Sequence, residues 1–134
     1  MFFKKDKINE KDSELIKVGA LLIHAAKIDE DYSQKEAEII KQALLKINSD
    51  IKDINQIIKK AEEIEKNSNQ ILDFTREIKN MSEQDKIKII KTLWKIIFSN
   101  KEADIYETNL MRRLAGLLYI DSKIMGDIKE QIKN

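Results

Sequence analysis

The fold is decided by one stretch of sequence, residues 87–98, which reads IKIIKTLWKIIF. On a helix, its apolar residues cover most of the circumference, while Lys88, Lys91 and Lys95 recur at the spacing of a single face. A helix that is apolar on nearly all sides needs neighbouring helices on several sides. The stretch therefore predicts the central helix of an all-α bundle, with the three lysines as its solvated stripe.

Amphipathic patterns on both sides of this stretch predict six further helices. Apolar residues at helical spacing define a first helix that is capped by Asp12 or Ser13 and ends near Lys27. Ser33 followed by Glu36 is the signature of a capping box at the start of the second helix. The other predicted helix starts follow Ser49-Asp50, Ser82, Asp104 and Asp121. We expect a single domain of about seven helices over residues 12–134, preceded by a flexible segment over residues 1–11.

The composition excludes several classes of protein. The chain has 134 residues with three Gly, no Pro and no Cys, which argues against a β-sandwich, a disulfide framework, a cysteine zinc site and a cysteine nucleophile. Lys and Arg number 25 against 24 Asp and Glu, so the formal net charge is +1. This near balance removes the electrostatic basis of strong nucleic-acid binding, and we expect no nucleic-acid partner.

The distribution of apolar residues predicts a cytoplasmic protein. No run approaches the roughly 20 residues of a membrane span, and the N-terminus has no apolar core typical of a signal peptide. Phe2 and Phe3 lie beside lysines and allow a weak peripheral membrane association. The interpretation that we favour is that the two phenylalanines cover the core or belong to a disordered end.

An internal repeat organises the chain. Residues 23–44 align without a gap on residues 94–115. Each segment contains an apolar helix, a short acidic turn, a capped helix start and a second apolar helix. Two such hairpins packed face to face would bury both apolar sets in one core with pseudo-twofold symmetry.

The two acidic turns also carry a family resemblance. The first turn reads DEDYSQKE over residues 29–36, and the second reads NKEADIYE over residues 100–107, followed by LMRRLA over residues 110–115. In these motifs the chain resembles the TerB-like family, which is named for a tellurite-resistance protein and is related to the N-terminal domain of the DjlA co-chaperone. Glu30 and Lys101 stand where the family usually has a turn glycine. The resemblance covers about residues 14–132 and implies an all-α domain with a link to tellurite or metal stress.

The acidic side chains of the turns allow two interpretations. The candidate ligands of a divalent cation, Ca²⁺ or Mg²⁺, are Asp29, Asp31 and Glu36 in the first turn and Glu102, Asp104 and Glu107 in the second. The resemblance supports this interpretation because acidic residues in such turns are suspected metal or partner contacts. The alternative, which we favour, is that these residues are helix caps and solvated acids. Glu36 and Glu107 each follow a capping residue by three positions and can bond back to it.

No catalytic constellation accompanies these turns. The single histidine, His24, has no second imidazole and no nucleophile pattern beside it, so we expect a packed or boundary residue. Trp94 beside Phe98 is typical of a core. We therefore expect a non-enzymatic interaction module that acts on a protein partner through the acidic turns. The alternative is a Ca²⁺ or Mg²⁺ sensor or buffer that uses the same carboxylates.

Overall fold

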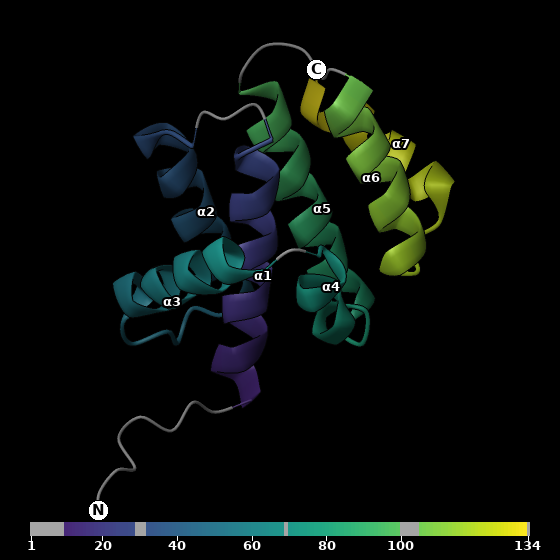
Figure 1. The fold of residues 1–134 in the computed structure, drawn as a ribbon. Helices are drawn as coiled ribbons and strands as arrows, with labels where there is room; N and C mark the ends of the chain where they lie inside the picture. The colour runs from purple at the N-terminus through teal and green to yellow at the C-terminus, as the bar shows by residue number, and fades with distance from the viewer. Residues whose placement is uncertain (1–9, 29–31, 69, 100–104, 134) are drawn as a thin grey trace, which may run out of the picture.

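The computed structural model describes residues 10–28, 32–68, 70–99 and 105–133, and these residues form seven α-helices and no strand (Figure 1). The helices are α1 (Glu10–Ala26), α2 (Gln34–Ile47), α3 (Ile54–Asn67), α4 (Leu72–Ile78), α5 (Glu83–Phe98), α6 (Ile105–Leu117) and α7 (Ser122–Lys133). The predicted all-α fold with about seven helices is confirmed. No helix within these residues is both long enough and apolar enough to cross a membrane.

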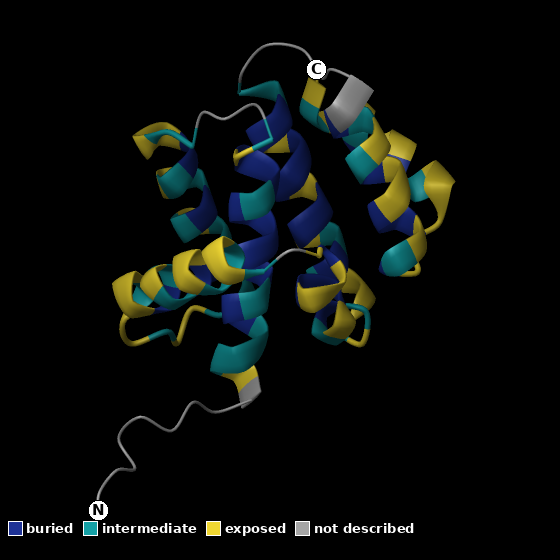
Figure 2. Ribbon diagram, viewed as in Figure 1, coloured by how far each residue is buried: buried dark blue, intermediate teal, exposed yellow. Residues whose placement is uncertain are grey.

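Two helices, α1 and α5, form the middle of the bundle. Helix α5 packs against α1, α2 and α7, as its apolar circumference predicts. Helix α1 packs against α2, α3, α4 and α5, so it is at least as central as α5. Figure 2 shows buried residues concentrated along these two helices. The apolar residues at helical spacing that define α1 in the sequence, such as Val18 and Leu22, describe one stripe, but Ala20, Leu21 and Ala25 on its other sides are buried as well.

Most helix starts agree with the sequence signals. Ser33 and Glu36 form the predicted capping box at α2, and the Ser82 side chain accepts a hydrogen bond from the backbone N–H of Asp85 at α5. The prediction for α3 was wrong: its N-cap is Asp53, whose side chain accepts from the backbone N–H of Gln56. Residues 48–53 form the connection between α2 and α3 instead, where the side chain of Asn48 accepts from the backbone N–H of Asp50.

The start of α1 lies earlier than expected. Helix α1 begins at Glu10, whereas the sequence patterns place the first cap at Asp12 or Ser13 and the domain boundary at residue 12. Residues 1–9, which include Phe2 and Phe3, lie outside the described residues. The expected contact of these two phenylalanines with a membrane or with the core therefore stays a prediction.

The predicted repeat relates α1 to α5 and α2 to α6. Glu36 and Glu107 are the third residues of α2 and α6, and both are buried. The connection between α5 and α6 lies outside the described residues, so the symmetry of the two hairpins stays a prediction.

Candidate functional site

Glu36 of the first acidic turn forms part of the capping box at the start of α2. It is 1% exposed, and its Oε1 accepts hydrogen bonds from the backbone N–H of Ser33 at 2.9 Å and from the Ser33 hydroxyl at 3.3 Å. The backbone N–H of Glu36 in turn donates to Ser33 Oγ at 3.2 Å. These bonds satisfy donors that the first turn of a helix leaves open. Glu36 is therefore a capping residue, and its Oε1 is engaged in the capping box.

Of the five remaining candidate ligands, Glu107 lies within the described residues and the other four do not. Glu107 is 4% exposed in the first turn of α6, a place where a carboxylate favours the positive end of the helix dipole. Asp29, Asp31, Glu102 and Asp104 lie outside the described residues. Within the described ranges, no group of three or more His, Cys, Asp or Glu side chains gathers to hold a metal ion. The predicted cation site, with its six candidate ligands, therefore stays a prediction.

Tyr32, within the first acidic turn, contacts α3 through its side chain. The Tyr32 hydroxyl lies 3.2 Å from Glu62 Oε2 and donates a hydrogen bond to it. Burial, together with the negative charge of Glu62 and this hydrogen bond, raises the pKa of Tyr32 above its ordinary value. The phenol therefore keeps its proton to a higher pH than an exposed tyrosine does. Its hydrogen bond to Glu62 links the first turn to α3.

His24 is a boundary residue, as predicted. Its ring lies 5.8 Å from that of Phe74, and its Nδ1 lies 3.3 Å from Glu65 Oε2. Lys27 Nζ donates to the other oxygen of the same carboxylate at 2.8 Å. Glu65 thus links α3 to the end of α1, and His24 takes part in a structural contact.

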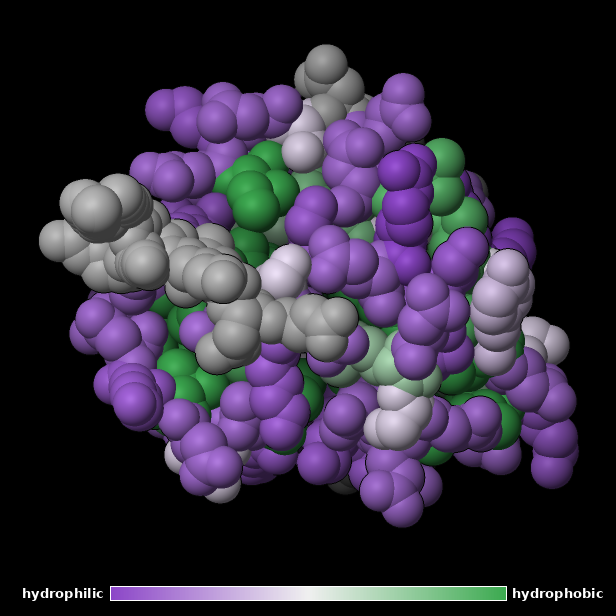
Figure 3. Space-filling view, turned by 90° about the horizontal axis from the view of Figure 1, so that it is seen from below, coloured by the Kyte–Doolittle hydropathy of each residue, from purple (hydrophilic) through white to green (hydrophobic). Residues whose placement is uncertain are grey.

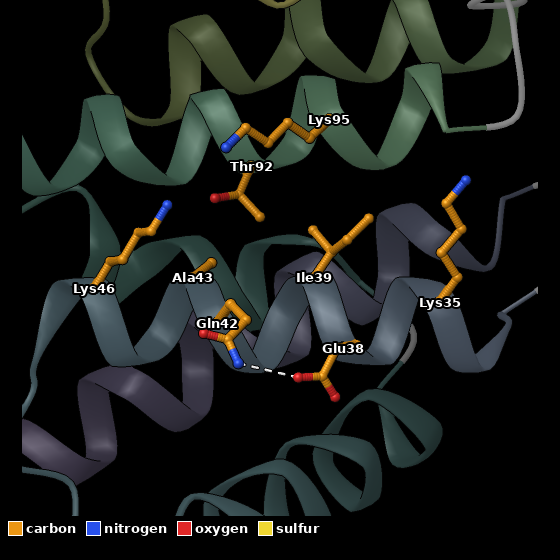
Figure 4. A pocket seen from close by; sticks show the side chains of 8 residues that line it. All are labelled: Lys35, Glu38, Ile39, Gln42, Ala43, Lys46, Thr92 and Lys95. Atoms are coloured by element: carbon orange, nitrogen blue, oxygen red, sulfur yellow. Dashed lines mark hydrogen bonds between the residues drawn. The ribbon is translucent and has the colours of Figure 1, made fainter.

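A groove between α2 and α5 is the larger of two candidate binding surfaces (Figure 4). Its volume is about 430 Å³, and Ile39 and Ala43 of α2 lie at its floor beside Thr92 of α5. Lysines stand around this floor: Lys35 and Lys46 come from α2 and Lys95 from α5. We call this feature the α2–α5 groove. Glu38 and Gln42 complete its lining.

The second surface surrounds Tyr119, directly after α6. Hydrophilic side chains cover most of the face drawn in Figure 3, and hydrophobic ones reach the surface there only in small separate patches. Within the described residues, the large hydrophobic side chains that stand exposed are Leu72, at 38%, and Tyr119, at 70%. Both line one hollow of about 150 Å³ between α4 and α6. We call this hollow the Tyr119 surface; it is lined by Leu72, Thr75, Arg76, Lys79, Gly116, Leu117 and Tyr119.

Tyr119 is held in an unusual backbone conformation. Its φ is 59°, in the left-handed region where glycine is the usual residue. The N–H of Tyr119 bonds to the carbonyl of Gly116, and the N–H of Ile120 bonds to that of Ala115. These two bonds form a Schellman motif that ends α6. The motif turns the chain so that the tyrosine ring stands exposed beside α4.

Two lysines flank this ring. Lys79 Nζ lies 6.0 Å and Lys86 Nζ 5.9 Å from the ring centroid. Lys86 is buried, and its Nζ also donates a 2.9 Å hydrogen bond to the carbonyl oxygen of Leu118. With the exposed Arg76, the Tyr119 surface carries positive charge around an apolar hollow.

Neither surface was predicted from the sequence, and the available signals differ. The α2–α5 groove has a weak signal, because Lys35, Ile39, Ala43 and Lys46 follow one another at helical spacing on one face of α2. That pattern is also typical of an ordinary boundary stripe. The Tyr119 surface has no such signal, since a glycine would mark the end of α6 and the nearest one, Gly116, lies before the turn.

Comparison with known protein families gives one match. The model of the family described as tellurite resistance protein TerB matches residues 15–130, which is most of the chain. No curated protein and no solved structure matches the chain.

Proposed function

The chain belongs to the TerB family, and from this premise we propose that it is a non-enzymatic interaction module that binds an acidic protein partner through the Tyr119 surface. The observation that carries this proposal is the exposure of Leu72 and Tyr119 around one hollow. Large apolar side chains that gather on a surface mark contact sites more often than single ones do.

The residue types at this surface support a protein contact. Tyrosine and arginine are enriched among the residues that contribute most to binding energy at interfaces. Tyr119 has a large ring with few rotatable bonds, and the exposed Arg76 has a guanidinium that can bind a carboxylate in two places. The hollow of about 150 Å³ suits one apolar side chain of a partner.

The local charge favours an acidic partner. Arg76 and Lys79 line the hollow, and Lys86 lies beside the ring. An acidic residue of the same helix, Glu77, faces α1, where it accepts a hydrogen bond from the Ser13 hydroxyl and lies 4.0 Å from Lys17 Nζ. The positive charges on the α6 side of α4 are thus available to carboxylates of a partner.

The backbone strain at Tyr119 also supports a functional role. A bulky residue in the left-handed region costs on the order of 1 kcal/mol relative to glycine. Such strain clusters at binding sites, where the position of one side chain matters more than local stability.

Affinity capture with the purified chain tests this proposal. We expect the wild-type chain to recover a partner with an acidic segment, and we expect Arg76→Glu to abolish the recovery. Arg112→Glu is the matched control, because Arg112 is an exposed arginine of α6 outside the surface. Equal recovery by the wild type and both variants would contradict the assignment of the partner to the Tyr119 surface.

The acidic turns are the competing contact surface. The sequence places carboxylates at Asp29, Asp31 and Glu102, and a partner that binds there would be basic. Charge reversal at these three positions distinguishes the two surfaces. Loss of recovery in that variant, with Arg76→Glu unaffected, would move the contact to the acidic turns.

A divalent-cation sensor or buffer remains the second candidate function, through the same turns. Calorimetric titration with Ca²⁺ and with Mg²⁺ tests it directly. A saturable heat and a higher melting temperature at millimolar metal would support the cation site. A flat titration together with an unchanged melting temperature would rule that site out and leave the interaction module.

The cellular context of the proposal comes from the family description, which concerns tellurite resistance. We extend the proposal to a cytoplasmic role in tellurite or metal stress. Cells that lack the chain should grow less well on tellurite, and the wild-type chain should restore growth while Arg76→Glu should not. Equal growth with and without the chain would remove tellurite from the proposal and leave the binding activity to be judged by affinity capture.

A further inference from the structure

The α2–α5 groove combines an apolar floor with a positively charged rim. Ile39 and Ala43 lie along one side and Thr92 along the other, while Lys35, Lys46 and Lys95 stand around them. Its volume of about 430 Å³ falls within the range of roughly 300–1,000 Å³ that small-molecule sites occupy. The groove therefore has the size and the lining of a site for a small amphiphile.

Three lysines and one carboxylate line the groove, so the rim carries a net positive charge. Glu38 is the carboxylate among the lining residues, and it accepts a hydrogen bond of 3.0 Å from Gln42 and lies 3.9 Å from Lys41. Figure 4 shows the bonded Glu38–Gln42 pair on the side of α2 away from α5, whereas Lys46 extends from α2 toward α5 and Lys95 runs along α5 toward Thr92. The carboxylate thus leaves the groove lysines available to an anion.

One end of the groove is suited to an anionic head group. Figure 4 shows the ammonium groups of Lys46 and Lys95 near Thr92, one reaching there from each helix. The Thr92 hydroxyl donates to the carbonyl oxygen of Lys88 at 2.9 Å, so the two ammonium groups supply the donors for a ligand. From this end the floor continues past Ala43 and Ile39 toward Lys35. The stretch of α2 from Lys46 to Lys35 is about 16 Å long at the rise of an α-helix.

The width of the floor suits a single alkyl chain. Its apolar part consists of Ile39 and Ala43, which follow one another along α2 beside Thr92. One extended alkyl chain contacts a floor of this width along its whole length, and the lysines of the rim complement its anionic head group.

We propose that the α2–α5 groove binds a free single-chain anionic amphiphile of the fatty-acid class, with its carboxylate between Lys46 and Lys95 and its alkyl chain along Ala43 and Ile39. This site is separate from the Tyr119 surface, so each proposal can fail without the other.

Calorimetric titration with fatty acids below their micelle concentration tests the ligand class. Decanoate is the probe, and octanoate has the same head group with two fewer methylenes. Each buried methylene contributes about fourfold in affinity, so we expect octanoate to bind about fifteenfold more weakly. Decyltrimethylammonium has the same tail with the opposite charge, and we expect no saturable binding of it.

Variants of the lysines test the placement of the head group. We expect the double variant Lys46→Glu/Lys95→Glu to bind decanoate about tenfold more weakly, given the modest energy of exposed ion pairs. Lys91→Glu/Lys123→Glu is the matched control, because both lysines are exposed outside the groove and the double variant changes the net charge by the same amount. Ala43→Leu fills the floor without a change in charge, and it should weaken decanoate more than it weakens octanoate.

Three results would overturn the proposal. The first is unchanged decanoate binding in both the double lysine variant and Ala43→Leu. The second is equal binding of decanoate and decyltrimethylammonium, which would indicate non-specific apolar adsorption. The third is binding to vesicles of phosphatidylglycerol with no saturable binding of free decanoate, which would assign the lysines to a membrane surface.

Discussion

Lys86 Nζ on α5 donates a 2.9 Å hydrogen bond to the carbonyl oxygen of Leu118, just after the end of α6. Lys86 is buried, so this bond is shielded from water. A helix leaves its last carbonyl groups without partners, and here a lysine from a distant part of the chain supplies one donor. The same ammonium lies 5.9 Å from the Tyr119 ring, so Lys86 supports the turn that presents Tyr119.

Replacement of this lysine should destabilise the fold. Lys86→Met keeps most of the side-chain volume but leaves the Leu118 carbonyl buried without this donor, which costs about 1–3 kcal/mol. Urea unfolding measures the loss. Lys91→Met, at an exposed position of the same helix, should change the free energy of unfolding by less than about 0.5 kcal/mol. Equal effects of the two changes would show that the Lys86 bond contributes nothing specific.

The strain at Tyr119 predicts that, of two variants that lose the ring, the glycine variant is the more stable. Tyr119→Gly and Tyr119→Ala both remove the ring, but only glycine adopts a φ of 59° without strain. We expect the glycine variant to be more stable than the alanine variant by about 1 kcal/mol, and both to lose the proposed acidic partner. Thermal unfolding and affinity capture provide the two measurements. A glycine variant no more stable than the alanine variant would contradict the strain at this turn.

Gly19 allows α1 to approach α3 closely. A Cβ atom at Gly19 would lie 3.0 Å from the Cβ of Ala61, whereas a Cβ at Gly126 in α7 would meet nothing within 4 Å. Alanine favours a helix over glycine by about 1 kcal/mol, so Gly126→Ala should stabilise the protein by up to that amount. Gly19→Ala should stabilise the protein less than Gly126→Ala does, because the new Cβ would meet that of Ala61 in a mild collision that α1 or α3 relieves only by moving a few tenths of an ångström.

A second substitution checks this contact. Ala61→Gly in the Gly19→Ala background removes the collision, so the double variant should be more stable than the sum of the two single effects predicts. Additive changes in the free energy of urea unfolding would show that Gly19 and Ala61 are not coupled, which would contradict a close contact between α1 and α3 at these residues.

Tyr32 predicts a loss of stability at alkaline pH. Its pKa in the folded protein is raised by burial and by Glu62, while the unfolded chain has the ordinary value of about 10. Above about pH 10 the unfolded state therefore loses the phenol proton first and binds fewer protons than the folded state. The free energy of unfolding then falls as pH rises, and the contribution is fully present below pH 10.

The Phe variant isolates this contribution. Tyr32→Phe cannot ionise, so its free energy of unfolding should fall less steeply above pH 10 than that of the wild type. Below pH 8 the variant should have a lower free energy of unfolding than the wild type, because it lacks the hydrogen bond from the Tyr32 hydroxyl to the Glu62 carboxylate. Parallel curves for the two proteins across pH 8–11 would contradict a raised Tyr32 pKa.

The sequence predicted the features that depend on neighbours in the chain. The capping box at Ser33 and Glu36 joins residues three positions apart, and the solvated stripe of α5 follows from the helical repeat alone. The start of α3 at Asp53 was missed because Ser49 and Asp50 offer equally good capping side chains. The depth of burial of α1 was underestimated, since a pattern of residues cannot count the helices that surround it.

The sequence by itself therefore determined the all-α fold and the seven helices that the described residues form, because helical periodicity and capping are local properties. The motifs of the acidic turns carried the resemblance to the TerB family. Tertiary structure alone decided which side chains meet across the bundle. It placed Lys95 opposite Lys46 over the α2–α5 groove, and it brought Lys86 to the end of α6, where Tyr119 is held in the left-handed region. These relationships join residues far apart in the chain, and their geometry depends on how the helices pack.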